Sequence, residues 1–537
     1  MLMLFLCPGP ADAVRRYVPC QFSTIQAAVN DSDPGDTVMV APGVYTGSGN
    51  KNIYFWDKDV TILSEGGAQV TTIDCEGSGR AFSLTGGLTR AALVSGFTIV
   101  NGHYSGGRGG AVWCGDGASP TIENIIFESN YAGNGGGSVA CASGANPVFS
   151  NCVMSGSWTT GSPGGAVTST DASPEFIDCT VEGNTGSVGG GMRIYGEGTV
   201  VLTNVTFRRN NGGAVYLDEC TSATLVNCAI TGHEADRGGA VHSNASGVVL
   251  ESCVIDSNDA VIQGGGVWAG GGSTLEMTDV EVRCNVAENG GGGVYVENSD
   301  ATFTGCTFYF NYGGIGDSWG DDDLGGGVYL KSCGTVIIDD CRFERNTALS
   351  GGALMARDGM SAEISSSVFA NNWATDYCGA IGDWGTSANI TNCTFRRNGA
   401  HWKYGGIGCK FGGSPQISHC LIAYSIFSEA VGCDNSQGEC FPVLECCDLY
   451  GNEEGDWVGC VEDQLGVDGN FSADPLFCST SHYDVSLSAN SPCLSDFHPP
   501  GSEACGLIGA GDVGCGTTEQ ATVVHTSWSG IKALYRN

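Results

Sequence analysis

A repeat of nearly constant length constrains this chain more than any other feature. Each unit opens with two glycines, a small residue and an aliphatic residue, and closes with a strand that ends in the tetrapeptide F-x-x-N or a close variant. The aliphatic residues follow one another at intervals of 23 to 28 residues, apart from one interval of 34. They are Val112, Val139, Val167, Met192, Val215, Val241, Val267, Val294, Val328, Leu354, Ile381 and Ile407. A fixed period of this length is typical of a solenoid, in which each unit is one layer that buries its apolar face by stacking on its neighbours.

The pattern within a unit is that of short strands. Val336 and Ile338, and then Cys341 and Phe343, lie two residues apart, which is the period of a β-strand. The corners between strands need positive φ or close backbone approach, and the paired glycines allow both. We expect the closing asparagines to stack, to hydrogen-bond along their column and to adopt the left-handed conformation. The predicted fold is an all-β parallel β-helix (a solenoid) of roughly 12–15 coils.

The repeat divides the chain into five predicted segments. They are a signal peptide (1–13), an N-terminal cap with entry coils (14–95), regular coils (96–430), a disulfide-rich cap of closing coils (431–516) and a C-terminal tail (517–537). The first segment is apolar and ends in Ala-Asp-Ala, as secretion signals do, although it lacks a positively charged start. Lipid attachment at Cys7 is the alternative. We expect a protein that is secreted or displayed on a bacterial cell surface.

A short helix is expected at the N-terminal end of the solenoid. Phe22–Val29 is amphipathic, and Ser23 with Gln26 three residues later forms a capping box. The first layer of a solenoid exposes its core and its strand edges unless something covers them. We therefore interpret this helix as a cap.

The 27 cysteines fall into distinct groups. One group occupies a single repeat position, which Ile125, Val205 and Val280 fill in other units, so we interpret its members as buried thiols stacked about 4.8 Å apart. Its members are Cys152, Cys179, Cys228, Cys253, Cys306, Cys341, Cys393, Cys420 and Cys447. A second group lies outside the repeat and is predicted to form disulfides, as in other secreted domains. Its members are Cys433, Cys440, Cys446, Cys460, Cys478, Cys493, Cys505 and Cys515. Cys114 and Cys141 occupy matching positions in adjacent layers and are a further candidate pair.

The composition excludes several classes of partner. Lys and Arg total 22 against 58 Asp and Glu, which gives a net charge of −36. Nucleic acids and anionic membrane surfaces are therefore not expected partners. No run of 18 apolar residues occurs, so we expect no transmembrane helix. We expect a monomer whose partner is a polysaccharide or a surface protein.

The loops between each tetrapeptide and the next glycine pair recur once per layer and so form one column. Function is usually placed on such loops of a rigid scaffold, and four of the ten tryptophans lie here. The column also carries His103, Tyr104 and Tyr131. We predict an aromatic platform suited to the apolar faces of sugars or to a protein partner. The alternative is that the rings cover the column's own small core. The predicted platform residues are Trp319, Trp373, Tyr377, Trp402 and Tyr404.

One insertion in this column, Asn311–Leu324, explains the interval of 34 residues and carries four aspartates. Carboxylate oxygens are the ligands that Ca²⁺ prefers. A calcium site at Asp317, Asp321, Asp322 and Asp323 is therefore one interpretation, and a solvated acidic tip is the other. Calcium is the one cofactor that we expect.

The pairing of the glycine corner with F-x-x-N resembles the repeat of the chlamydial polymorphic outer-membrane proteins. It is also similar to secreted bacterial right-handed β-helix proteins of the pectin-lyase-like superfamily. The matching residues include Gly109–Val112 with Phe127–Asn130 and Gly351–Leu354 with Phe369–Asn372. The resemblance implies a right-handed solenoid, and the polymorphic family implies an adhesive surface protein carried by a C-terminal membrane barrel. The superfamily also contains enzymes that cleave polysaccharides.

Three functions remain open from the sequence. Our first expectation is an adhesin-like or carbohydrate-binding module that acts through its loop edge. A polysaccharide lyase or glycoside hydrolase is the alternative, but the G-H-G and R-I-K elements that the resemblance implies for the hydrolases are absent, and we name no catalytic residue. The third possibility is a spacer. A binder should show a continuous aromatic strip, whereas an enzyme should show acids and a base in one groove.

Overall fold

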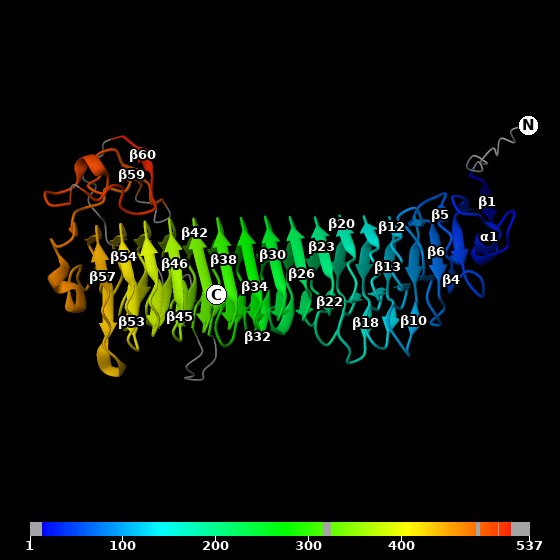
Figure 1. The fold of residues 1–537 in the computed structure, drawn as a ribbon, viewed down its shortest axis with the longest axis horizontal. Helices are drawn as coiled ribbons and strands as arrows, with labels where there is room; N and C mark the ends of the chain where they lie inside the picture. Colours follow the sequence, from blue (N-terminus) through cyan, green and yellow to red (C-terminus); the bar gives the residue numbers. More distant parts are fainter. Residues whose placement is uncertain (1–12, 315–323, 480–483, 503, 517–537) are drawn as a thin grey trace, which may run out of the picture. The chain divides into compact units, whose positions relative to one another are not determined.

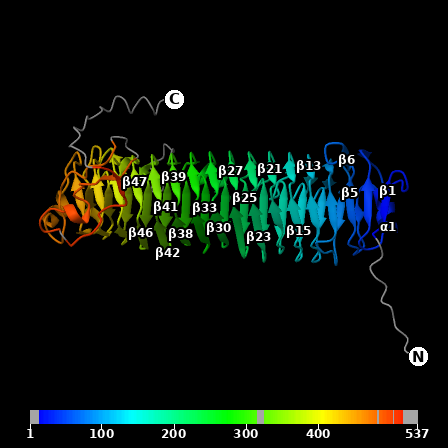
Figure 2. The ribbon, with the colours of Figure 1, turned by 90° about the horizontal axis from the view of Figure 1, so that it is seen from above.

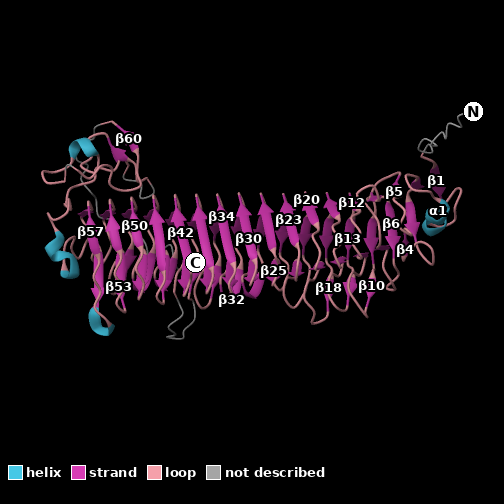
Figure 3. Cartoon of the chain, in the orientation of Figure 1, coloured by secondary structure: helices cyan, strands magenta, loops and turns pink. Residues whose placement is uncertain are grey.

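The computed structural model describes residues 13–314, 324–479, 484–502 and 504–516. It contains two compact units, residues 1–336 and 337–537. The predicted signal peptide and the C-terminal tail lie outside the described residues, apart from Ala13. Almost all regular structure is β-strand, as the cartoon in Figure 3 shows. The described residues form a parallel β-solenoid of about 19 turns, which confirms the predicted fold class.

A single turn shows how the repeat becomes structure. In the first unit, β37 (Val294–Glu297), β38 (Asp300–Thr304), β39 (Thr307–Tyr309) and β40 (Tyr312–Gly313) follow one another around the solenoid. Each pairs in parallel with its equivalent one turn earlier, so that Val267 lies beside Val294 and Val282 beside Phe308. The alternating residues Ala301 and Phe303 are buried. Strands of successive turns therefore lie side by side, as Figures 1 and 2 show within each unit.

Four kinds of strand recur, and we name the rows that they form sheets A, B, C and D. In the first unit, sheet A runs from β1 (Arg15–Val18) to β38, sheet B from β3 (Gly43–Tyr45) to β39, and sheet C from β4 (Ile53–Tyr54) to β41 (Val328–Lys331). In the second unit, sheet A includes β46 (Ser361–Ser365) to β57 (Val443–Glu445), sheet B β43 (Arg342–Glu344) to β58 (Asp448–Tyr450), and sheet C β45 (Leu354–Arg357) to β56 (Val431–Asp434).

Sheet D is the predicted loop column. Its strands in the first unit are β10 (His103–Tyr104), β14 (Tyr131–Ala132), β18 (Trp158–Thr159), β28 (Glu234–Arg237), β32 (Asp259–Gln263), β36 (Val286–Ala287) and β40. Those in the second unit are β44 (Thr347–Ser350), β48 (Trp373–Tyr377) and β52 (Gly399–Ala400).

The number of turns exceeds the predicted 12–15 coils. The predicted entry segment already contains β1, β2 (Thr37–Val40), β5 (Thr61–Ser64) and β8 (Leu93–Ser95), which pair in parallel in that order. These turns lack the glycine-pair signature, so the repeat pattern undercounts them. The solenoid begins well before the regular repeat does.

The closing asparagines form buried ladders in both units. The side-chain Nδ2 of Asn258 donates to Oδ1 of Asn285 at 2.9 Å, and that of Asn372 donates to Oδ1 of Asn398 at 2.9 Å. Stacking and amide hydrogen bonding are thus confirmed. The left-handed conformation is wrong for the asparagine itself, because positive φ falls on the preceding residue, as at Ser257 (56°) and Cys284 (53°). That residue makes the corner, and the asparagine then points inward.

His233 takes the place of asparagine in one turn of the first unit. Its Nδ1 accepts a hydrogen bond from the backbone N–H of Asn210 at 3.0 Å, and the backbone N–H of His233 donates to Oδ1 of Asn258 at 3.1 Å. The side chain is fully buried. Burial lowers the pKa of His233 to about 4, although the carbonyls of Asn210 and Phe207 oppose the shift. The ladder therefore holds a neutral imidazole at neutral pH.

At most corners the first residue is a glycine that contact as well as conformation requires, and Gly264 is an example. Gly264 has φ +66°, and a Cβ there would lie 2.4 Å from the carbonyl oxygen of Val267. A Cβ on the second glycine, Gly265, would lie 2.3 Å from the carbonyl oxygen of Val286 in the next turn. Real Cβ atoms do not approach so closely, so side chains are excluded from both positions.

The predicted N-terminal helix is present but is capped differently. Helix α1 (Ile25–Asp31) buries Ile25, Ala28 and Val29 against the first strands. Its N-cap is Thr24, whose Oγ1 accepts a hydrogen bond from the N–H of Ala27 at 3.2 Å. The predicted capping box of Ser23 and Gln26 is wrong, since the N-cap falls one residue later than Ser23 and Gln26 instead accepts from the N–H of Tyr54.

The stacked cysteines are thiols, as predicted. All nine are buried, and Sγ of Cys152, for example, donates to the carbonyl of Ser150 at 3.3 Å. Cys114 and Cys141 lie in register but remain thiols, so the proposed pair does not form. Stacked phenylalanines fill the same core, with Phe343, Phe369 and Phe395 at centroid separations of 4.8 Å.

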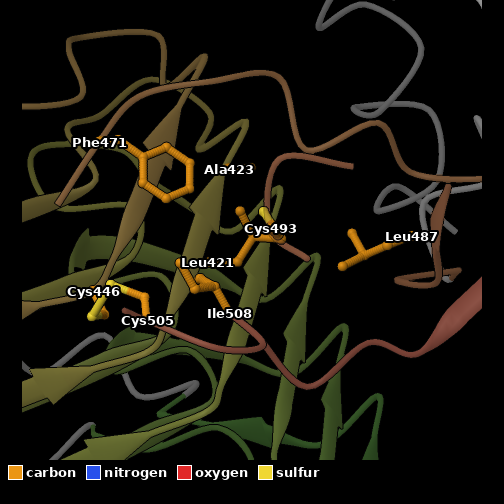
Figure 4. Packing of buried hydrophobic residues seen from close by; sticks show 8 residues of the cluster. All are labelled: Leu421, Ala423, Cys446, Phe471, Leu487, Cys493, Cys505 and Ile508. Atoms are coloured by element: carbon orange, nitrogen blue, oxygen red, sulfur yellow. A yellow bond between two sulfur atoms is a disulfide. The ribbon is translucent and has the colours of Figure 1, made fainter. Parts of the chain in front are cut away.

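A C-terminal segment folds against sheet B of the second unit. The disulfides Cys433–Cys460, Cys446–Cys505 and Cys478–Cys515 hold it. The predicted role in disulfides is wrong for Cys440 and Cys493, which are buried thiols. Figure 4 shows the cluster beneath the segment, where Cys493 and Ile508 pack near Leu421 of β55 (Leu421–Ala423). The segment therefore buries Leu421 and Ala423, which lie at the outward-facing positions of β55.

Asp448 is a buried acid under this segment. Its Oδ1 accepts from the N–H of Ala473 at 3.0 Å, and its Oδ2 accepts from Sγ of Cys493 at 3.3 Å. Burial, aided by the charges of Asp456 and Asp474, raises the pKa of Asp448 to about 8, although the hydrogen bonds from Ala473 and Cys493 oppose the shift. The carboxyl is therefore protonated at neutral pH.

His233→Asn should complete the ladder and remove a pH dependence. The folded protein resists protonation of His233 until about pH 4, whereas an unfolded histidine binds its proton near pH 6.5. The wild type therefore loses stability as pH falls from 6.5 to 4, by roughly 2–3 kcal/mol from this group. The difference in Tm between variant and wild type should grow over that range in thermal unfolding followed by circular dichroism. The exposed His401→Asn is the control, and a difference independent of pH would contradict the assignment.

Asp448→Asn should act in the opposite pH range. Asn reproduces the protonated carboxyl, so the two proteins should match near pH 4. The folded Asp448 holds its proton up to about pH 8, whereas an unfolded Asp releases it near pH 4, so the wild type loses stability progressively as pH rises from about 4 to about 8. At pH 8 to 9 the variant should therefore have a higher Tm than the wild type. The measurement is calorimetry of the full chain, read at the unfolding transition of the second unit. Asp496→Asn, at an exposed acid, should show no such gain.

Candidate functional site

The predicted platform residues of the second unit lie on or beside sheet D but do not form a flat surface. Trp402 is 64% exposed. Trp373 is half-buried, with its ring 6.3 Å from that of Phe427 and nearly perpendicular to it. Tyr377 is half-buried, and its ring lies 6.2 Å from that of Tyr404. Trp319, Asp317, Asp321, Asp322 and Asp323 lie outside the described residues, so the platform residue and the calcium site there stay predictions.

Tyr404 is buried, in contrast to the exposed position expected for a platform. Only 4% of it is accessible. Its ring occupies a hollow on sheet C, because a Cβ on Gly432 would lie 1.9 Å from the ring and a Cβ on Gly408 2.7 Å from it. Burial accordingly raises the pKa of Tyr404. This ring fills space on the scaffold and supports Tyr377.

A lysine lies among the aromatic rings of this edge. The Nζ of Lys410, at the end of β53 (Ile407–Lys410), is 5.2 Å from the ring centre of Tyr377, 5.4 Å from that of Trp384 and 5.1 Å from that of Phe411. It also pairs with Asp434 at 3.4 Å. Cation–π attraction and the ion pair hold the lysine in place. The edge is therefore an aromatic cluster around a paired cation.

A continuous aromatic strip lies on sheet D of the first unit, on the neighbouring strands β10, β14 and β18. Figure 1 labels β10 and β18 near its lower edge. His103, Tyr131 and Trp158 are partners in register on consecutive turns. Their ring centres are 4.5 Å and 5.6 Å apart, with the planes tilted by 35° and 44°. Trp158 is 42% exposed, and the other two are half-buried. We call these three residues the aromatic strip.

An arginine extends the aromatic surface beside the strip. The guanidinium of Arg80 lies 4.1 Å from the ring centre of Tyr104 and 5.7 Å from that of Trp113. Its NH2 group donates to the carbonyl of Arg108 at 3.1 Å. Tyr104 is exposed. Burial lowers the pKa of Arg80, which Tyr104 partly offsets, and the group stays cationic at neutral pH.

A second row of rings, which the sequence analysis did not select, projects from sheet C of the first unit. Tyr216 on β25 (Val215–Asp218), His242 on β29 (Val241–Asn244) and Trp268 on β33 (Val267–Gly270) are in register. Their ring centres are 4.4 Å apart at each step and the rings are stacked. The available signal was the residue directly after each repeat aliphatic, which points outward because side chains alternate along a strand.

Cations border this row. Arg193 on β22 (Met192–Tyr195) occupies the same position one turn before Tyr216, and its NH2 group lies 3.4 Å from Oδ2 of Asp218. The guanidinium of Arg237 lies 5.6 Å from the ring centre of Trp268. Burial lowers the pKa of His242 to about 4, while the carbonyl of Arg237 opposes the shift. Burial, aided by Asp218, raises the pKa of Tyr216.

At neutral pH this row thus presents a neutral imidazole and a protonated phenol beside guanidinium groups. A neutral imidazole can accept a proton and a phenol can donate one. Within the described residues, no group of three or more His, Cys, Asp or Glu side chains is placed to hold a metal ion. Nor does any helix in the described part of the chain combine the length and apolarity needed to cross a bilayer.

Comparison with solved structures returns carbohydrate-active enzymes at low similarity. The alginate lyase AlyGC of family PL6 is 9% identical, with 82% of this chain and 76% of that chain covered and a TM-score of 0.32. The pectate lyase Pel9A is 10% identical, with 94% and 97% covered and a TM-score of 0.25. A GH87 α-1,3-glucanase catalytic domain solved with nigerose is 10% identical, with 81% and 69% covered and a TM-score of 0.27. Such low TM-scores indicate nothing about activity.

Sequence comparison gives one partial relative and one family. A stretch of 164 residues is 28% identical to "Metabotropic glutamate receptor-like protein R" of Dictyostelium discoideum. That match covers 30% of this chain and only 10% of the relative's length. The model of the family described as "Right handed beta helix region" matches residues 87–246 and 238–471. Since these matches together cover more than half of the chain, the protein belongs to the right-handed β-helix family.

Proposed function

We propose that this protein is a secreted or surface-displayed carbohydrate-binding β-helix that contacts its ligand through the aromatic strip. The observation that carries the proposal is the register of His103, Tyr131 and Trp158 on three consecutive turns. The three disulfides of the second unit support an oxidising, extracellular environment. A polysaccharide on a neighbouring cell or matrix is the partner that fits an adhesin-like role.

The geometry of the strip suits a sugar chain. Tilted rings leave parts of their faces accessible, and the apolar face of a pyranose packs against such a face. The exposed ring of Tyr104 next to Arg80 adds a further contact surface with a cationic donor. Because Tyr131 is held between the rings of His103 and Trp158, little of its side-chain entropy is lost on binding.

The edge of the second unit is proposed as an additional contact. Trp402 is 64% exposed, and Trp373 and Tyr377 are the first and last residues of β48. In this proposal Tyr404 acts by supporting Tyr377. The aspartates of the insertion, Asp317 and Asp321–Asp323, are proposed to bind Ca²⁺.

A polysaccharide lyase or glycoside hydrolase is the second candidate function, and the sheet C row favours the lyase. Arg193 offers a guanidinium for a sugar carboxylate, and His242 is a neutral base beside the phenol of Tyr216. In a β-elimination the base removes the proton next to the carboxylate, a carbon–carbon double bond forms, and the leaving oxygen takes a proton. The products would carry an unsaturated sugar end.

The strip predicts a specific loss of binding. Trp158→Ala and Tyr131→Ala should each weaken binding to the polysaccharides recovered in a glycan screen by about tenfold, because each removes roughly 1.4 kcal/mol of ring contact. Affinity would be measured by calorimetry with and without Ca²⁺. Trp56→Ala is the matched control, since Trp56 is 65% exposed in the same unit but lies outside the strip. Equal losses in all three variants would contradict the proposal.

The same samples separate binder from enzyme. Binding without new reducing ends or ultraviolet-absorbing unsaturated ends is the result that we expect. Turnover that disappears in Tyr216→Phe and in His242→Ala would instead establish the lyase. Trp402→Ala tests the second edge, and it should lower affinity less than Trp158→Ala does.

A further inference from the structure

A cavity of about 450 Å³ opens between the C-terminal segment and the corner that joins sheets A and B in the second unit. One wall is the corner itself, with Ser366, Asn392 and His419 on three successive turns. The other wall is the stretch from Cys505 to Ala510. Pockets for small organic ligands commonly have volumes of 300 to 1,000 Å³, so the space suits one such molecule.

The corner side chains here differ from those of the first unit. Corner amides there bond along the column, as where Nδ2 of Asn151 donates to Oδ1 of Asn124 at 2.7 Å and Nδ2 of Asn227 to Oδ1 of Asn204 at 2.7 Å. Among the described residues, the side chains of Ser366, Asn392 and His419 have no hydrogen-bond partner. Their hydrogen-bonding groups remain available at the cavity.

Backbone conformation presents these three side chains in one line. Ser366, Asn392 and His419 have φ of 49°, 52° and 52°. The left-handed conformation costs free energy for residues other than glycine, so the corner geometry is imposed by the turns on either side. The backbone of this wall is therefore held by the solenoid on either side.

The opposite wall is also fixed. The disulfide Cys446–Cys505 anchors its start, and the buried Ile508 donates its N–H to the carbonyl of Cys493 at 3.0 Å. Gly509 donates to the carbonyl of His419 at 2.8 Å, and Ala510 donates to Oγ1 of Thr394 at 2.9 Å. Leu507, between these anchors, is 41% exposed and lines the cavity. The pocket is therefore preformed, which reduces the entropy lost on binding.

We propose that this cavity is a binding site for a single neutral sugar residue. Its lining combines hydroxyl, amide and imidazole groups with one isobutyl side chain, so it offers donors, acceptors and an apolar contact together. A sugar matches all three, because its hydroxyls both donate and accept while its C–H face is apolar. The described lining residues include no Asp, Glu, Lys or Arg and no Phe, Tyr or Trp. A charged group would gain no ion pair there, and a nucleobase would find no ring on which to stack.

This inference is independent of the proposed function. The pocket shares no residue with the aromatic strip or with the sheet C row, and it takes one sugar unit rather than the side of a chain. Either site can fail without the other. A protein with both would hold the side of one glycan and a terminal residue of the same or another glycan.

The test uses the full chain and four probes: glucose, galactose, mannose and N-acetylglucosamine. We expect saturation-transfer NMR to detect at least one of them, with a Kd in the millimolar range by titration. Leu507→Trp, which fills the cavity, should abolish that signal, and the double variant Asn392→Ala/His419→Ala should weaken it at least tenfold. Asn124→Ala, at the same corner position in the first unit, should leave it unchanged.

Two results would overturn the site itself, and a third would overturn the class of ligand. One is the absence of any signal from all four sugars with the wild type, and the other is unchanged binding by Leu507→Trp. Glucuronate serves as the charged counterpart of glucose, and tighter binding of glucuronate would refute the neutral class. Circular dichroism and a thiol count of the variants confirm that the fold and the Cys446–Cys505 disulfide are retained.

Discussion

Parallel hydrogen bonding in exact register between successive turns is the constraint on which the rest of this structure depends. Val267 lies beside Val294, and the residues of sheets A and B likewise lie beside their equivalents in the next turn. In sheet D the register shifts by one residue within β28 and within β44. A residue type that recurs in the sequence therefore becomes a column in space. The buried amide ladder through Asn258 and Asn285 and the exposed strip through Tyr131 and Trp158 are both products of this single rule.

The rule also explains how much of the fold the sequence could predict. The period predicted the solenoid, the buried thiols and the asparagine ladder, because these depend only on stacking equivalent positions. Features set by the path of the chain within one turn were missed. Positive φ falls on Ser257 rather than Asn258, and the helix is capped by Thr24 rather than Ser23. The repeat also could not predict which of the last cysteines form disulfides, because Cys440 and Cys493 lie where no repeat fixes their neighbours.

The candidate site, like the fold, could be predicted only in part. The sequence correctly placed aromatic residues on one column, but it could not say which rings reach the surface, because exposure depends on the residue beneath each ring. Gly408 and Gly432 leave a hollow on sheet C that Tyr404 fills. At the same repeat position in the first unit stand Tyr216 and His242, whose rings project outward instead. A substitution on the sheet thus decides whether a loop ring is structural or available for a ligand.

Electrostatics bears on the choice between the two candidate functions. A net charge of −36 repels polyanions at long range, and only local cations within about 8 Å, the Debye length at physiological salt, can offset that repulsion. Arg193 is already paired with Asp218, so the carboxylate partly neutralises its charge. The aromatic strip needs no charge on its ligand, because ring contacts act on the apolar faces of any sugar. The charge balance of this protein therefore favours neutral glycans at the strip over acidic substrates at the sheet C row.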